Sequence, residues 1–87
     1  MTNDTPNHLR EIKLAGHVLE RWREAATYLA TVNAALVAEV DALGWGCTPL
    51  SLTRCAMAAR YIAVSEAEPY AGAARALTTE FEEMAKG

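Results

Sequence analysis

The chain has 87 residues, of which 52% are hydrophobic, and a formal net charge of −3. A domain of this size buries only somewhat over ~60% of the surface of its unfolded chain, so a monomer is expected to be marginally stable. The high apolar fraction excludes a disordered chain and favours burial of some apolar surface against another chain. Because the charges are interspersed and slightly acidic, nucleic acid is not an expected partner.

Two cysteines are too few for a disulfide scaffold, and the polar first residues do not form a secretory signal. We therefore expect reduced thiols in a cytoplasmic protein. The longest uncharged run, between Glu24 and Glu39, is shorter than the ~20 residues of a membrane-spanning helix. The sequence thus predicts no membrane segment.

The first half of the chain predicts one long amphipathic helix over about residues 6–43. Thr5 suits the capping position, and Pro6 suits the first turn, where its missing N–H donor has no partner in any case. Apolar positions in this stretch recur with alternating spacings of three and four, which places them on one helical stripe. The stripe consists of Ile12, Ala15, Leu19, Trp22, Ala26, Leu29, Asn33, Leu36, Val40 and Leu43.

Two shorter helices are predicted to follow. Gly44 is expected to end the first helix in the left-handed conformation, with Trp45 folded back on Val40. Thr48 and Pro49 repeat the helix-start signal, which predicts a second helix over about residues 49–66 in an antiparallel hairpin with the first. Pro69 interrupts it and predicts a third helix over about residues 69–86. Their inner stripes are Leu52, Cys55, Ala59 and Ile62, and Tyr70, Ala73, Leu77, Phe81 and Met84.

The sequence therefore predicts an all-α fold in one helical domain, residues 1–87: a long N-terminal helix in a hairpin with two shorter helices. Because a two-layer hairpin leaves one side of the long helix bare, either the third helix folds back to give a three-helix bundle or two hairpins pair in a dimeric helical bundle. The segment over residues 25–38 is apolar on most sides, which favours pairing as a homodimer.

Asn33 is the one strongly polar residue in the apolar row of the long helix. In a seam between two chains, such an asparagine pairs with a partner amide and fixes the register. The alternative is a hydrogen bond within its own chain, to Tyr61 or Thr53. The predicted oligomer interface comprises Trp22, Leu29, Asn33, Leu36 and Val40.

No motif for catalysis or for metal binding is recognisable. The spacings between His8 and His17 and between Cys47 and Cys55 are unlike those of zinc-ligand pairs. Glu-x-x-His pairs, nucleophile motifs and phosphate-binding glycine loops do not occur in the sequence. We therefore expect no catalytic residues, no metal and no cofactor, and the protein is not expected to be an enzyme.

Two charged faces and one aromatic residue are candidates for contact with a partner. Basic residues at positions 10, 13, 17 and 21 are interleaved with acidic ones, which is typical of a solvated helix face. The outer face of the third helix is acidic, through Glu80, Glu82 and Glu83, and either contacts a basic partner or is solvated. Trp45 is at the predicted turn, and tryptophan is enriched at interface hot spots. The predicted partner contacts are Trp45, Glu80, Glu82 and Glu83.

The function expected from these features is a small non-enzymatic protein–protein interaction module, an adaptor or an inhibitor of a larger macromolecular complex. Its partner is then a protein, with a homodimer as the assembly. The alternative is a small nucleic-acid-binding or regulatory subunit, of the viral packaging or transcription accessory type. Salt-dependent binding of DNA distinguishes the two classes.

Overall fold

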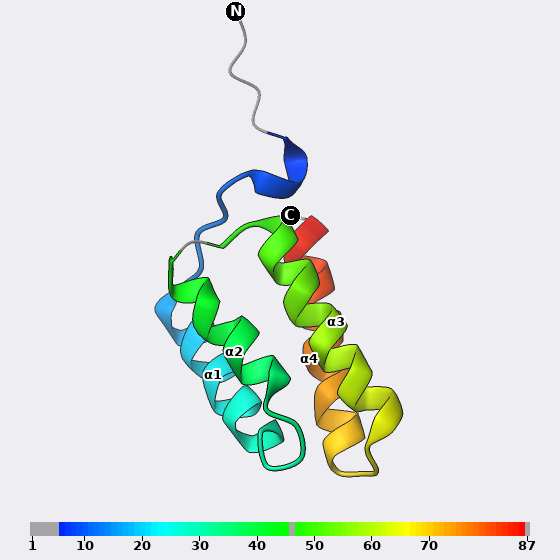
Figure 1. Ribbon diagram of the computed structural model, residues 1–87. Helices are drawn as coiled ribbons and strands as arrows, with labels where there is room; N and C mark the ends of the chain where they lie inside the picture. The colour runs from blue at the N-terminus through cyan, green and yellow to red at the C-terminus, as the bar shows by residue number, and fades with distance from the viewer. Residues whose placement is uncertain (1–5, 46, 87) are drawn as a thin grey trace, which may run out of the picture.

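The chain forms two helical hairpins packed against each other in a computed structural model, which describes residues 6–45 and 47–86. Successive helices run in alternate directions, and the last helix also contacts the first (Figure 1). The all-α class is thus confirmed for the described residues. Their elements are, in order, η1 (Asn7–Leu9), α1 (Gly16–Leu29), α2 (Ala35–Ala42), η2 (Leu43–Trp45), α3 (Pro49–Ser65) and α4 (Tyr70–Lys86), where η denotes a short 3-10 helix.

The predicted single helix over residues 6–43 is wrong, and the first departure is an extended segment over residues 10–15, here called the N-terminal arm. Ile12 and Leu14 pack partly buried against the core while their neighbours are exposed, which is the alternation of an extended chain. The backbone N–H of Ile12 donates to the carbonyl of Cys47 at 2.8 Å. The arm is therefore held against the linker between α2 and α3.

The second departure is a reversal of the chain over residues 30–34. Asn33 lies in this turn, and its Oδ1 accepts a hydrogen bond from the backbone N–H of Ala35 at 2.9 Å. A side-chain amide that bonds its own backbone favours a turn over a continuous helix. Both predicted roles of Asn33, the apolar seam and the bond to Tyr61 or Thr53, are therefore wrong.

The helix over residues 49–66 begins as predicted. The hydroxyl of Thr48 accepts from the N–H of Ser51 at 3.1 Å, and the Ser51 hydroxyl accepts from the N–H of Thr48 at 2.8 Å. This reciprocal pair is a capping box, and Pro49 occupies the first turn. The left-handed helix end predicted at Gly44 is wrong, because α2 is followed directly by the right-handed η2.

The helix predicted over about residues 69–86 is also present, as α4, which starts directly after Pro69. It folds back along α3 over the length of both helices (Figure 1). Because α1 and α2 fold back on each other as well, the bundle has four α-helices within the described residues, where three were predicted.

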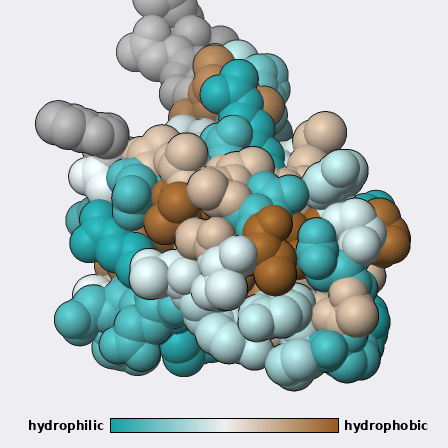
Figure 2. Space-filling view, turned by 60° about the horizontal axis from the view of Figure 1, so that its bottom comes forward, coloured by the Kyte–Doolittle hydropathy of each residue, from teal (hydrophilic) through white to brown (hydrophobic). Residues whose placement is uncertain are grey.

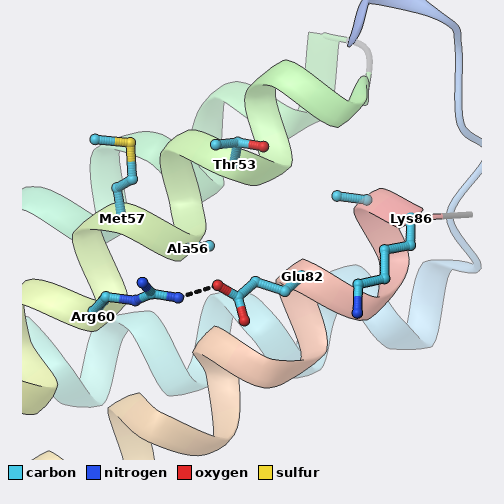
Figure 3. A pocket seen from close by; sticks show the side chains of 7 residues that line it. Thr53, Ala56, Met57, Arg60, Glu82 and Lys86 are labelled. Atoms are coloured by element: carbon cyan, nitrogen blue, oxygen red, sulfur yellow. Dashed lines mark hydrogen bonds and ion pairs between the residues drawn. The ribbon is translucent and has the colours of Figure 1, made fainter. Parts of the chain in front are cut away.

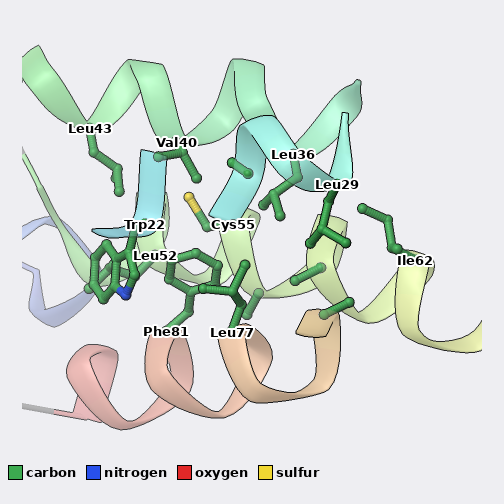
Figure 4. Close-up of a cluster of buried hydrophobic side chains, with 14 of the residues drawn as sticks. Trp22, Leu29, Leu36, Val40, Leu43, Leu52, Cys55, Ile62, Leu77 and Phe81 are labelled. Carbon is green, nitrogen blue, oxygen red and sulfur yellow. The ribbon is translucent and has the colours of Figure 1, made fainter. Parts of the chain in front are cut away.

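The core lies between the two hairpins and takes side chains from all four α-helices (Figure 4). Trp22 of α1 contacts Phe81 of α4 edge to face, with ring centroids 4.8 Å apart. The side chains of Trp22, Leu29, Leu36 and Val40 are at most 1% exposed in the single chain. Their predicted place in an oligomer interface is therefore wrong: the hairpin of α3 and α4 already covers them. Dimerisation itself stays a prediction.

The turn at Asn33 can be tested by substitution. Asn33→Ala removes the acceptor for the first N–H of α2 and is expected to lower the free energy of unfolding by about 1 kcal/mol, the usual effect of losing a helix-start side chain. In a domain of this size that lowers the melting temperature by roughly 4–8 °C. Asn33→Asp keeps the acceptor and should melt close to the wild type.

Circular dichroism during heating and urea titration measures both variants. An Asn33→Ala protein as stable as the wild type would contradict the role of this side chain in the turn.

Candidate protein-binding surface

Glu80, one of the predicted partner contacts, is occupied within the chain. The indole Nε1–H of Trp22 donates to its Oε1 at 3.0 Å, and the guanidinium of Arg21 lies 2.7 Å from the same carboxylate. A buried indole N–H needs an acceptor, since leaving it unpaired costs free energy. Glu80 therefore joins α1 to α4.

The other predicted acidic contacts are partly neutralised. Glu82 forms an ion pair with Arg60 of α3 (Figure 3). Glu83, whose side chain is 69% exposed, lies 3.7 Å from the ammonium group of Lys86. Trp45 ends η2, but its side chain lies outside what the structure describes, so its predicted contact stays a prediction. The outer face of α4 is thus less acidic than its sequence suggests.

The basic residues predicted along the first helix are split between two elements. Arg10 and Lys13 lie in the N-terminal arm, where Arg10 donates to the carbonyl of Ala85 at 3.3 Å. His17 and Arg21 lie on α1, and Arg21 is paired with Glu80. No continuous basic stripe results from this arrangement.

Both cysteines are buried free thiols. Burial raises the pKa of Cys55 to about 12, with smaller contributions from Glu39 and Cys47. Burial also raises the pKa of Cys47, although a hydrogen bond with Ser51 opposes the shift. Because the thiolate is the nucleophilic form, neither thiol is suited to catalysis near neutral pH.

Residues 6–45 and 47–86 contain no group of three His, Cys, Asp or Glu side chains that is placed to hold a metal ion. Nor is any helix in these residues both long enough and apolar enough to cross a membrane.

The exposed side of α3 has a row of four apolar residues and one arginine, here called the outer α3 stripe: Leu50, Arg54, Met57, Tyr61 and Val64. The spacings alternate between four and three, so these residues share one helical face. The last three are 67%, 60% and 78% exposed, and they are three of the five large hydrophobic residues that the described chain exposes. Exposed apolar residues gathered on one face mark interaction sites more often than scattered ones do.

Charge separates α3 from the rest of the molecule. This helix contains two arginines and no aspartate or glutamate, in a chain of net charge −3. Arg60 is paired with Glu82, whereas Arg54 has no ion pair among the described residues. The outer α3 stripe is therefore apolar with one free cation.

Two shallow hollows flank this stripe. The first, of about 480 Å³, lies between α3 and α4 and is lined by Met57, Arg60 and Glu82 among others (Figure 3). The second, of about 340 Å³, lies between α2 and α3 and is also lined by Met57, with Arg54 and Tyr61. The side chain of Met57 thus lies between the two hollows and lines both of them. The end of the bundle with the turns after α1 and α3 instead shows separate apolar patches between hydrophilic residues (Figure 2).

The outer α3 stripe is absent from the contacts predicted from the sequence, which include only the inner stripe of this helix. Two signals were available. A second row with alternating spacings of four and three runs opposite the buried one, and no acidic residue occurs between Pro49 and Ser65. A helix with a single buried face normally has polar residues on the other.

The structural role of Glu80 predicts a difference between two substitutions. Glu80→Ala leaves the indole N–H of Trp22 without an acceptor and is expected to lower the free energy of unfolding by about 1–3 kcal/mol. Glu80→Gln keeps an acceptor oxygen and loses only the exposed ion pair with Arg21, which is worth about 0–1 kcal/mol. Urea denaturation measures both values, and equal losses in the two variants would refute this role.

The raised pKa of Cys55 predicts a dependence of stability on pH. From the ordinary value of 9.0 up to about 12, the unfolded chain releases the thiol proton while the folded chain keeps it. The free energy of unfolding should therefore fall as the pH rises above 9.0, with no contribution from this group below that value.

Urea denaturation at about pH 8 and about pH 10 should show a larger loss for the wild type than for Cys55→Ala. Tyrosine and lysine ionisation affect both proteins alike, so the difference isolates the thiol. Equal losses would contradict a buried, protonated Cys55.

No protein-family model, curated protein or solved structure matches the chain. Within the described residues, the outer α3 stripe combines exposed apolar side chains with a helix that has no acidic residue.

Proposed function

We propose that the chain is a small, non-enzymatic, cytoplasmic protein–protein interaction module, an adaptor or an inhibitor of a larger macromolecular complex, which binds protein through the outer α3 stripe. The observation that carries this proposal is the concentration of exposed apolar side chains on one helix without acidic residues. Tyrosine, methionine and arginine, which are enriched in protein interfaces, all occur in this stripe.

The shape of the surface supports a helical ligand. Because Met57 lies between the two hollows, a partner helix has two places to lie alongside α3. Helices bound in grooves contact their receptors through anchors spaced by three and four residues. Met57 is also suited to such contact, because its flexible thioether adapts to different partner surfaces.

A nucleic-acid-binding function has weaker support. Among the arginines of α3, Arg60 is neutralised by Glu82 and only Arg54 lacks an ion pair in the described part of the chain. A single unpaired arginine on α3, in a protein of net charge −3, provides little of the positive surface that phosphate binding requires.

The proposal predicts that a charge placed in the stripe abolishes partner binding. Tyr61→Glu should weaken binding of a captured host protein by at least about 30-fold, the effect of removing an interface hot spot. The matched control is Leu9→Glu, which makes the same type of change at a residue 46% exposed in η1. Affinity capture from the native host with mass spectrometry identifies the partner, and titration with that protein measures affinity.

Circular dichroism must first show that both variants are folded. Unchanged affinity of Tyr61→Glu for the captured protein would refute the proposed surface. Salt-sensitive, sub-micromolar binding of generic duplex DNA in a polarisation assay would instead favour the nucleic-acid alternative.

A further inference from the structure

We propose that the N-terminal arm is a strap that lifts off the bundle while α1 to α4 stay folded, and that its lifting uncovers the thiol of Cys47. This inference is independent of the proposed function, because none of the contacts that carry it involves the outer α3 stripe. They lie at the end of the bundle where the arm, the linker between α2 and α3, and the end of α4 meet (Figure 1).

The first argument is the small number of bonds that hold the arm. Among the described residues, its residues 10–14 make one backbone hydrogen bond to the bundle, from the N–H of Ile12 to the carbonyl of Cys47. The side chain of Arg10 adds one more, to the carbonyl of Ala85 at 3.3 Å. No ion pair fastens the arm in this part of the chain. A segment held by so few bonds opens at a lower free energy than the core of a bundle.

The second argument is that the apolar contact of the arm is incomplete. Ile12 and Leu14 are only partly buried, whereas core residues of the helices such as Leu52 and Ile62 are fully buried. A shallow hollow of about 350 Å³ lies between the arm and the bundle, lined by Ile12, Leu14 and Cys47 among others. The arm therefore buries little apolar surface, so its release costs much less free energy than unfolding of the helices.

The third argument is the position of Cys47 beside the arm. Ile12 and Cys47 form an isolated antiparallel bridge, so their side chains lie next to each other on one side of the paired backbones. Cys47 is only 4% exposed although it belongs to a linker, where side chains usually lie at the surface. Release of the arm removes the cover that Ile12 provides. Cys55, which lies in the core on α3, stays covered by the helices.

The closed arm also affects the chemistry of the thiol. Burial raises the pKa of Cys47, so the closed state keeps this thiol protonated as well as covered. Because the exposed thiolate is the reactive form, both effects slow its reaction with electrophiles. The position of the arm thus determines when Cys47 can react.

Labelling of the full chain with iodoacetamide, a neutral thiol reagent, tests the strap, and peptide mass spectrometry separates the two cysteines. In buffer, Cys47 should react at least about tenfold faster than Cys55, because the arm opens more often than the whole bundle unfolds. Urea below the unfolding transition should accelerate Cys55 steeply and Cys47 only slightly, since the urea dependence scales with the surface that an opening exposes. Equal rates with the same urea dependence would overturn the strap, because the thiol would then be exposed only by unfolding.

Two substitutions assign the opening to the arm. Ile12→Ala truncates the side chain beside Cys47 and should accelerate labelling of Cys47 by at least about fivefold. The matched control, Lys13→Ala, truncates the next residue of the arm, which is exposed, and should change the rate by less than about twofold. Circular dichroism verifies that both variants are folded. An unchanged rate in Ile12→Ala would show that another movement uncovers the thiol, which overturns the role of the arm.

Hydrogen exchange of the Ile12 amide gives a second readout, from the other side of the bridge. Since this N–H donates to the carbonyl of Cys47, its exchange requires the bridge to break. Its exchange rate should therefore show the same weak urea dependence as the labelling of Cys47. An Ile12 amide that exchanges only on global unfolding, beside a rapidly labelled Cys47, contradicts the strap.

Discussion

Burial of Trp22 is the constraint on which the bundle depends. Trp22 is the largest of the fully buried side chains, and its indole N–H must find an acceptor away from water. Phe81 supplies the ring contact and Glu80 the acceptor, both from α4. Satisfying one residue of α1 therefore fixes the rotation and height of the last helix, and α3, which lies along α4, takes its position from that contact.

Much of the fold is predictable because helix caps and core stripes are local signals. Thr48, Pro49 and Pro69 give the starts of α3 and α4, and Trp22, Leu29, Leu36 and Val40 are apolar at helical spacing. The break at Asn33 is not predictable from that spacing, because α1 and α2 both turn their apolar faces to one core and the row continues across the turn. The periodicity shows that this row is buried, but it does not show whether a second chain or the same chain covers it, because that depends on how the helices pack. The outer α3 stripe is visible in the sequence as a second row of mainly apolar residues. Only the exposed fractions of its side chains in the structure distinguish it from the buried row.

The N-terminal arm and the end of α4 lie at one end of the bundle, where Arg10 donates to the carbonyl of Ala85 (Figure 1). A sequence joined to either side of the domain therefore leaves from that end, with entry and exit adjacent, while the turns after α1 and α3 occupy the far end.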